Sequence, residues 1–308
     1  MIFLVTGCAG FIGSHYAELI LRDGCEVIGV DNFDELLYGR EIKQNNLSHL
    51  LKFPNFEFKN INIADLELED KELVVINFAA LAGQRYSWNN ITSYFNVNTF
   101  SPLRLFERLE QKNSIHRFVQ ISTSSVYGIN AVSSEDGKVE PISPYGISKL
   151  AGEQLLKAHI GNERSALSIF RLFSVYGPRQ RPDMAYFRII DCLLKNKPFH
   201  LFGSGHQSRT NTFVDDVCKS ISHSISLSNL PTIMNIGGNQ TCTLLEAITM
   251  LENISGKRLQ IIYEESELGD QVETRAHLNL AREHLDYNPL TTLQEGLQKQ
   301  FDYTARIN

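Results

Sequence analysis

A tyrosine and a lysine four residues apart, Tyr145 and Lys149, are the pair in this sequence best suited to proton transfer. At this spacing the two side chains lie on one face of a helix. Tyrosine has an ordinary pKa of about 10, and lowering it by ~3 units takes about 4 kcal/mol of phenolate stabilisation. One positive charge ~4 Å away supplies about that much at an effective dielectric constant near 20. We therefore expect Lys149, helped by an oxidised nicotinamide, to make Tyr145 a working base, although a surface Tyr–Lys pair has the same spacing.

A second chemical feature is glycine-rich and lies at the N-terminus. The apolar run 2–6 leads directly into Gly7, Gly10 and Gly13 and then into a helical pattern. These glycines permit a tight turn and the close approach of a pyrophosphate, and the helix N-terminus offers unpaired N–H donors. Asp31 ends the next expected strand, where a carboxylate accepts hydrogen bonds from ribose hydroxyls and repels a 2′-phosphate. The pattern predicts a dinucleotide site for NAD rather than NADP.

Hydroxyl side chains form the third feature, at residues 121–128. They follow an expected strand, and parallel sheets of this kind bind ligands beyond the carboxyl ends of their strands. Thr123 is therefore expected to share a hydrogen bond with the substrate hydroxyl that Tyr145 deprotonates. A Ser/Thr-rich loop that caps its own backbone is the alternative interpretation.

The elements that position these residues alternate between strand and helix. Strands are expected at 2–6, 26–31, 56–63, 73–78, 117–123, 167–172 and 232–236, and helices at 13–23, 94–111, 144–159 and 212–228. This order predicts an α/β fold with a Rossmann-type, doubly wound parallel sheet. We expect residues 1–173, joined by 212–236, to form the NAD-binding domain. Residues 174–211 and 237–308 are expected to form a smaller, mostly helical substrate cap.

Bulk composition excludes several other classes of protein. The chain has 308 residues, 43% of them hydrophobic, and a net charge of −6 without a basic cluster, which argues against nucleic-acid binding. Its five scattered cysteines suit reduced thiols rather than zinc or disulfides. The apolar start lacks the basic region of a signal peptide, and no apolar stretch is long enough to cross a bilayer. We expect a cytoplasmic protein without a metal and without membrane attachment.

Taken together, these residues resemble the extended short-chain dehydrogenase/reductase family, in its NAD-dependent nucleotide-sugar epimerase/dehydratase group. The resemblance covers essentially the whole chain and rests on residues 7–13, 31–32, 78–80, 96–97, 123, 126–128, 145, 149, 175–178 and 213–217. It implies NAD contacts from Gly7, Gly10, Phe11, Ile12, Gly13, Asp31, Asn32, Ile63, Ala79, Ala80, Tyr145 and Lys149. It also implies a homodimer built on helices 94–111 and 144–159, with Leu103, Leu150 and Leu155 as contributors.

Within this family, the two residues after the catalytic Thr or Ser separate the reactions. In the dehydratases of this family these two residues are Asp and Glu. UDP-glucuronate decarboxylases are similar to them in having Glu at the second position. This chain has Ser124 and Ser125, which donate hydrogen bonds but are not acids or bases near neutral pH. The resemblance therefore implies a 4-epimerase, with Thr123, Tyr145 and Lys149 as its catalytic residues. Tyr145 would remove the proton of the sugar 4-hydroxyl while NAD takes the hydride, which then returns to the other face of the 4-keto sugar.

The substrate expected from the resemblance is UDP-glucuronate, because residues 79–87 and 176–185 are similar to the corresponding stretches of UDP-glucuronate 4-epimerases. Arg181 and nearby hydroxyls would surround the sugar carboxylate, which suits an arginine fork. The substrate-binding residues implied are Arg85, Ser124, Ser125, Ser174, Arg181 and Arg209, the last by its likeness to the arginine that pairs with the diphosphate. Alternatively, Arg181 binds the diphosphate or packs against an acid.

Departures from the family pattern at Asn62, Ser174 and His277 leave the nucleotide and the sugar open. A 4-epimerase of a dTDP-6-deoxyhexose or of a UDP-hexose remains the nearer alternative. The alternative from another class is a non-catalytic NAD-binding sensor, which the intact Thr-Tyr-Lys set disfavours because sensing does not require a tuned phenolate.

Overall fold

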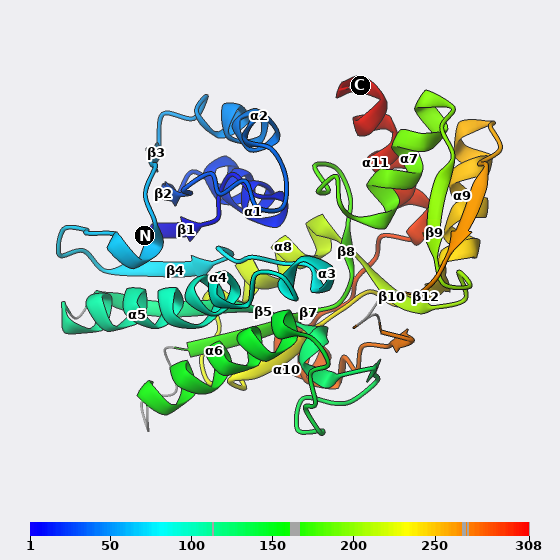
Figure 1. Cartoon of the computed structure of the whole chain (residues 1–308). Helices are drawn as coiled ribbons and strands as arrows, with labels where there is room; N and C mark the ends of the chain where they lie inside the picture. The colour runs from blue at the N-terminus through cyan, green and yellow to red at the C-terminus, as the bar shows by residue number, and fades with distance from the viewer. Residues whose placement is uncertain (113, 161–166, 267–268, 270, 308) are drawn as a thin grey trace.

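A seven-stranded parallel sheet forms the centre of the molecule, as shown by a computed structural model that describes residues 1–112, 114–160, 167–266, 269 and 271–307 (Figure 1). Its strand order is β11-β7-β5-β4-β1-β2-β3. The strands are β1 (Ile2–Thr6), β2 (Glu26–Val30), β3 (Phe56–Lys59), β4 (Leu73–Asn77), β5 (Ile115–Thr123), β7 (Leu167–Leu172) and β11 (Ile233–Ile236). The order reverses at β1, as in a doubly wound sheet, so the predicted fold class is confirmed.

Helices cover both faces of this sheet because its central strands are apolar on both sides. Along β4, Val74 and Ile76 pack into one core cluster, and Leu73 and Val75 pack into another, as the strand period of two requires. The first cluster contains residues of α1 (Phe11–Arg22), α2 (Arg40–Leu50) and α8 (Val214–Ile225). The second contains residues of α5 (Ser101–Gln111) and α6 (Pro144–Ile160).

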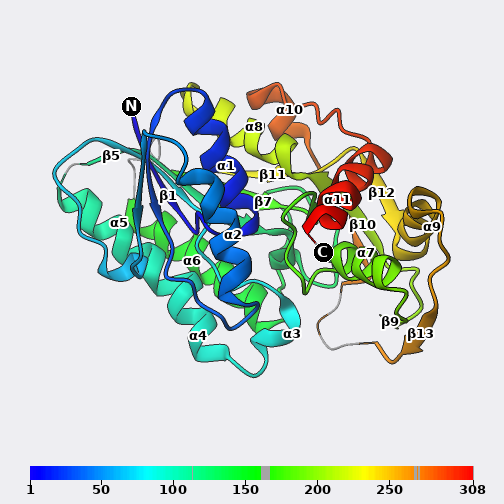
Figure 2. The same cartoon turned by 90° about the horizontal axis from the view of Figure 1, so that it is seen from above.

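A smaller region of helices and short strands lies at the carboxyl ends of the sheet strands (Figure 2). Its helices are α7 (Ala185–Lys195), α9 (Leu244–Ser255) and α11 (Leu293–Ile307), whereas α10 (Asn279–Leu285) lies against α8 and β11 of the main sheet. A five-stranded sheet joins β6 (Asn130–Ala131), β8 (Val175–Tyr176), β10 (Ser208–Phe213), β12 (Gln240–Thr243) and β14 (Glu273–Thr274), and β9 (Phe199–Phe202) pairs with β13 (Ile261–Glu264). The first core cluster continues through α7, α9 and α11, so this region packs directly on the sheet.

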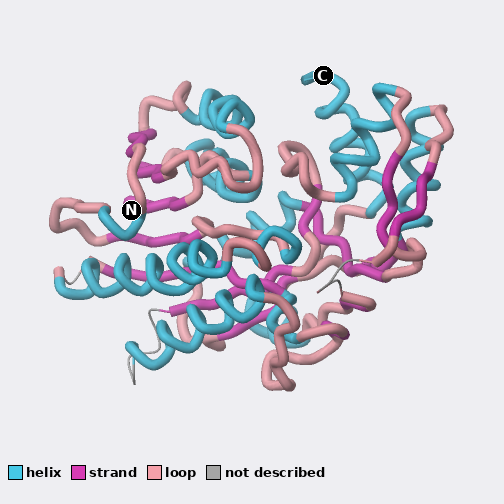
Figure 3. The backbone as a smooth tube through the Cα atoms, viewed as in Figure 1, coloured by secondary structure: helices cyan, strands magenta, loops and turns pink. Residues whose placement is uncertain are grey.

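Local differences from the expected elements have simple causes. The helix expected from residue 212 begins at Val214, because residues 208–213 form β10 of the second sheet. The helix expected at 94–111 begins earlier, as α4 (Ile91–Phe95), and passes through a π-helical turn (Asn96–Phe100) into α5. Helices α2 and α7 and the short strands of the second sheet were not predicted (Figure 3). The strands are too short to show an alternating pattern, whereas the buried residues of α7, Tyr186, Ile189, Ile190 and Leu193, do recur at helical spacing and were overlooked.

None of the helices within the described ranges is both long enough and apolar enough to cross a membrane.

Candidate active site

A cavity of about 450 Å³ opens at the carboxyl ends of β1, β4, β5 and β7. Each of these strands ends in a segment that lines it, as expected where the order of a doubly wound sheet reverses. The cavity brings together every residue expected to bind cofactor: Gly7, Gly10, Phe11, Ile12, Gly13, Asp31, Asn32, Ile63, Ala79, Ala80, Tyr145 and Lys149. It is also lined by Thr123 and by five of the six expected substrate residues: Ser124, Ser125, Ser174, Arg181 and Arg209.

The glycine turn between β1 and α1 leaves no space for side chains. Gly7 has φ +66°, and a Cβ there would lie 2.8 Å from the amide nitrogen of Ala79. A Cβ on Gly13 would lie 2.2 Å from the carbonyl oxygen of Gly7. Gly10 caps the 12-residue helix α1 without a side-chain hydrogen bond, so the first N–H groups of α1 remain available to an anion. This backbone fits the pyrophosphate of a dinucleotide.

Asp31 is held in place by the backbone at the other end of the cofactor region. Its Oδ1 accepts a hydrogen bond from the amide of Phe33 at 2.8 Å, and its Oδ2 accepts one from the amide of Ala9 at 3.2 Å. Each carboxylate oxygen keeps a further lone pair for a ribose hydroxyl. Burial raises the pKa of Asp31, against the opposing effect of Lys43, whose Nζ lies 4.0 Å from Oδ1. Lys43 was missed from the sequence because it reaches the cavity only through the packing of α2.

Tyr145 and Lys149 lie on the first turns of α6 and line the cavity, where Lys149 is buried and Tyr145 is partly buried. The Nζ of Lys149 donates a hydrogen bond to the carbonyl oxygen of Ile121 at 2.5 Å. Burial raises the pKa of Tyr145, and it outweighs the hydrogen bond with Thr123 and the charge of Arg181, which act in the opposite direction. Lys149 and the oxidised nicotinamide are still predicted to favour the phenolate, and the burial of Tyr145 within the chain acts against them. Desolvation, which the sequence does not reveal, is the larger effect.

Lys149 is itself affected by its surroundings. Burial lowers its pKa to about 8, and the carboxylate of Glu153, one helical turn further along, acts in the opposite direction. Glu153 is fully buried and receives hydrogen bonds from Ser122 and from the Nε and Nη2 atoms of Arg171, the latter at 2.7 Å. This buried pair ties α6 to strands β5 and β7 and fixes the helix that carries Tyr145 and Lys149.

The other end of the cavity holds polar groups of both charges. Arg181 directs Nε and Nη2 at the two carboxylate oxygens of Asp183, at 3.0 and 2.8 Å. The amide of Gln84 donates to Ser125 Oγ at 3.1 Å, and Thr123 donates to the same oxygen at 3.2 Å. Arg181 therefore packs against an acid, and its roles toward a sugar carboxylate or a diphosphate stay predictions.

The two remaining arginines among the expected substrate residues, Arg209 and Arg85, lie in different surroundings. Arg209 lines the cavity, and its Nη1 donates to the carbonyl oxygens of Ser208 and Val272. Arg85 is absent from the residues found to line the cavity, and its guanidinium lies 5.3 Å from the ring centroid of Phe202. Sequence reasoning also missed Gln84, because a neutral amide beside a serine loop carries no motif.

No group of three or more His, Cys, Asp or Glu side chains within the described residues is arranged to hold a metal ion.

Comparison with known proteins places this site in a family. Residues 3–237 match the model of the NAD dependent epimerase/dehydratase family. An uncharacterized UDP-glucose epimerase, YtcB of Bacillus subtilis, is 37% identical over 100% of this chain and 99% of its own length. A UDP-glucuronate 4-epimerase of Thermodesulfobacterium geofontis is 34% identical over 98% of this chain and 95% of its own.

Solved structures agree in fold over the full length. The UDP-glucuronic acid 4-epimerase from Bacillus cereus, in complex with UDP-glucuronic acid and NAD, superposes with a TM-score of 0.93 at 34% identity, with 100% of each chain covered. The UDP-glucose 4-epimerase from Thermotoga maritima, with UDP-glucose, gives a TM-score of 0.87 at 28% identity, covering 100% of this chain and 99% of its own. With the glycine turn and the Thr-Tyr-Lys set in one cavity, this chain belongs to the NAD dependent epimerase/dehydratase family of enzymes.

Proposed function

We propose that this protein is an NAD-dependent nucleotide-sugar 4-epimerase that acts on UDP-glucuronate. The observation that carries the proposal is the single cavity shared by the glycine turn, the Thr123–Tyr145–Lys149 set and Arg181. Ser124 and Ser125 lie where proton-transferring carboxylates would be needed for dehydration, so oxidation and reduction at C4 remain. The similarity to UDP-glucuronate 4-epimerases over nearly the whole chain supports the same reaction.

In the mechanism that we infer, Tyr145 accepts the proton of the sugar 4-hydroxyl and later returns it. Thr123 hydrogen-bonds to Tyr145. In this mechanism Thr123 also orients the sugar 4-hydroxyl, and the ammonium of Lys149 helps to stabilise the phenolate. NAD, when bound, supplies the hydride acceptor and donor for the sugar carbon. Inversion requires the 4-keto sugar to present its other face before reduction, so the sugar pocket has to hold it loosely enough to turn.

The residue roles follow the same proposal. The NAD contacts would come from Gly7, Gly10, Phe11, Ile12, Gly13, Asp31, Asn32, Ile63, Ala79, Ala80, Tyr145 and Lys149, and the substrate contacts from Arg85, Ser124, Ser125, Ser174, Arg181 and Arg209. We assign cofactor binding to residues 1–173 with 212–236, and substrate binding to residues 174–211 and 237–308. Arg85 is the weakest member of this set, because its guanidinium packs on Phe202.

A neutral UDP-hexose is the second candidate substrate, and one contact favours it. Asp183 already occupies the guanidinium fork of Arg181, so the pair presents little net charge to a ligand. A neutral C6 hydroxyl could bind beside Ser125 and Gln84 without displacing Asp183. The B. subtilis relative described as a UDP-glucose epimerase is consistent with this candidate.

We further propose a cytoplasmic homodimer. Apolar side chains are exposed on the helical layer of α5 and α6: Phe100 is 44% exposed, Ile147 44% and Leu155 37%. Two copies of this layer could bury them together in a four-helix interface. Leu103 and Leu150, expected at the same interface, are half-buried against the chain's own core clusters. All five cysteines are free, as is usual for cytoplasmic proteins.

NMR of the purified protein with NAD and one nucleotide sugar at a time tests the function. UDP-glucuronate, UDP-glucose and a dTDP-6-deoxyhexose are compared, and the proposal expects UDP-glucuronate to convert to its 4-epimer fastest. Conversion of UDP-glucose alone would replace the substrate. No conversion of any sugar by protein that binds NAD would favour the sensor.

A further inference from the structure

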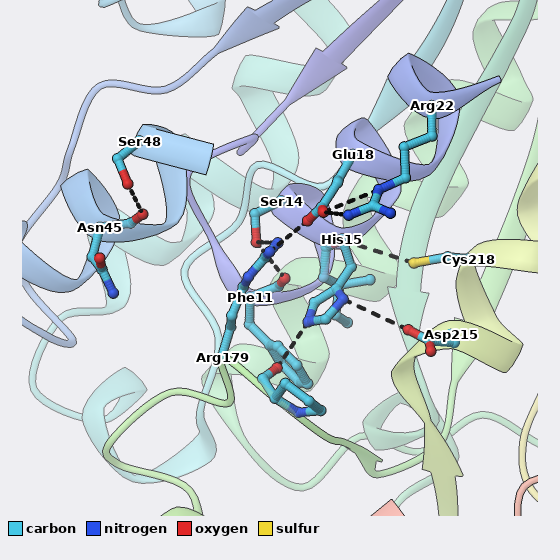
Figure 4. A network of polar contacts seen from close by, with 12 residues as sticks. Phe11, Ser14, His15, Glu18, Arg22, Asn45, Ser48, Arg179, Asp215 and Cys218 are labelled. Atoms are coloured by element: carbon cyan, nitrogen blue, oxygen red, sulfur yellow. Dashed lines mark hydrogen bonds and ion pairs between the residues drawn. The ribbon is translucent and has the colours of Figure 1, made fainter. Parts of the chain in front are cut away.

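A short turn after β8, residues 177–183, connects three parts of the molecule through successive side chains. Arg181 lies in the cavity, as described above. Gln180 is buried, and its Oε1 accepts hydrogen bonds from the amide of Phe187 and from Gln300 of α11, at 3.0 and 2.7 Å. Arg179 instead directs its guanidinium at α1, the helix that begins at the glycine turn (Figure 4).

The contact between Arg179 and α1 is an almost buried ion pair. Its Nη2 lies 2.5 Å from Oε2 of Glu18, and its Nη1 lies 3.4 Å from Ser14 Oγ. The side chains of Arg179 and Glu18 are 8% and 16% exposed, so solvent screens their attraction only weakly. Beside them, His15 Nε2 contacts the carbonyl oxygen of Pro178 at 2.9 Å. Two adjacent residues of the turn are thus fastened to α1.

This contact is maintained against two unfavourable features. Arg179 has φ +62°, a left-handed conformation that is unfavourable for a non-glycine residue. Its Nε is buried without a hydrogen-bond partner in the part of the chain that the structure describes. A side chain that served only to cover the surface would not need either feature. The backbone conformation instead turns Arg179 toward α1 while Arg181, two residues later, lies in the cavity.

We propose that Arg179 is a positioning residue for substrate binding: by its ion pair with Glu18 it fastens the 177–183 turn to helix α1 and so holds Arg181 at the sugar end of the cavity. The inference rests on the proposed function, in which Arg181 contacts the nucleotide sugar. Arg179 touches neither ligand in this account, so its effect has to pass through Arg181. It also gives the cofactor helix and the substrate turn a fixed relative position.

Kinetics of Arg179→Met and Glu18→Gln test the proposal, with Arg22→Met as the matched control. Arg22 pairs with the other carboxylate oxygen of Glu18 at 2.6 Å but is 68% exposed and does not reach the turn. The two test variants should raise KM for the nucleotide sugar about tenfold, the weight of one charge-assisted hydrogen bond, with kcat and NAD affinity within about twofold of the parent. Arg22→Met should match the parent, and Arg179→Lys should recover part of the loss.

A double-mutant comparison separates positioning from a general loss of structure. If Arg179 acts through Arg181, then Arg179→Met should change KM less than about twofold when Arg181→Met is already present. An undiminished tenfold effect in that background, or an equal loss in Arg22→Met, would overturn the proposal. Arg179→Gly adds a further test: it removes the backbone strain with the side chain, so parent-like KM in this variant would also overturn it.

The experiment distinguishes the two levels of inference. The substrate proposal is decided by which sugar the parent enzyme converts. KM of every variant is then measured with that sugar. The positioning proposal is decided by comparing the KM values of the variants for that one sugar. Thermal melting of each variant confirms that it is folded, and Arg179→Lys, the mildest change, keeps the test available if Arg179→Met melts below the assay temperature.

Discussion

Asp183 holds the guanidinium of Arg181 with both carboxylate oxygens, at 3.0 Å from Nε and 2.8 Å from Nη2, inside the cavity that contains Tyr145. Such a bidentate pair is both strong and directional. A substrate carboxylate must therefore compete with Asp183 for the same fork. The charge of Arg181 also lowers the pKa of Tyr145, so the pair links sugar recognition to the acid–base group.

Removing the competing charge should reveal which sugar Arg181 serves. Asp183→Asn should lower KM for UDP-glucuronate several-fold and leave KM for UDP-glucose nearly unchanged. Arg181→Ala should raise KM for UDP-glucuronate on the order of tenfold more than for UDP-glucose, because a charge-assisted hydrogen bond contributes about 1.5–3 kcal/mol. Steady-state kinetics with both sugars measures this. Equal losses for both would assign Arg181 to the pyrophosphate that they share.

Tyr145→Phe should retain NAD and lose about two to four orders of magnitude in turnover, the usual contribution of a positioned acid–base group. The phenyl ring fills the same buried space, so folding should be unaffected. Turnover and bound NAD are measured on the same preparation. Near-parent turnover would remove Tyr145 from the mechanism.

The pH dependence of kcat should report the phenolate. Tyr145 accepts the proton of the sugar only as the phenolate, so kcat at saturating sugar should increase with pH. Because burial raises the pKa of Tyr145, this increase should extend to higher pH. The positive charge of Arg181 favours the phenolate, and Arg181→Ala should therefore shift this increase to higher pH. An increase that stays in place would show that Arg181 does not act on Tyr145. Saturation with sugar is checked at each pH.

Acid should destabilise the fold through His15. Burial, together with the charge of Arg179, lowers the pKa of His15 to about 4, against the ordinary 6.5. The unfolded chain therefore takes up the proton at higher pH than the folded one, and stability is lost as pH falls from about 6.5 toward 4. Protonation of this one group costs on the order of 3 kcal/mol when complete.

His15→Gln keeps a hydrogen-bond donor for Pro178 but cannot titrate. Urea unfolding at pH 7 and at pH 4.5 should show a smaller loss of unfolding free energy in this variant than in the parent. The same loss in both proteins would mean that other groups carry the acid sensitivity.

Light scattering at micromolar concentration should give about twice the 34.9 kDa mass of one chain. Leu155→Glu should shift the protein toward the monomer, since it places a charge on the exposed apolar face of α6. Leu290→Glu is the control, because Leu290 is 78% exposed but lies outside α5 and α6. A monomeric parent, or equal effects of both changes, would contradict the proposed interface.

Sequence by itself determined the features that are local. Gly7 to Gly13 lie between one strand and one helix, and Tyr145 and Lys149 are neighbours because a helix brings residues four apart together. Alternating strand and helix patterns then limit the fold to a doubly wound sheet, whose geometry gathers the loops after β1, β4, β5 and β7. That the glycine turn and the Thr-Tyr-Lys set line one cavity could therefore be predicted without coordinates, whereas their roles in binding and catalysis stay predictions.

Only the tertiary structure decided the charge environment of these side chains and the direction in which they point. Lys43 meets Asp31 because α2 packs beside α1, and Glu153 is neutralised by Arg171 from a strand 18 residues away. The pKa of Tyr145 is raised because desolvation exceeds the attraction of nearby positive groups. Burial, pairing and the direction of a side chain depend on segments distant in sequence, and their free energies cannot be read from spacing alone.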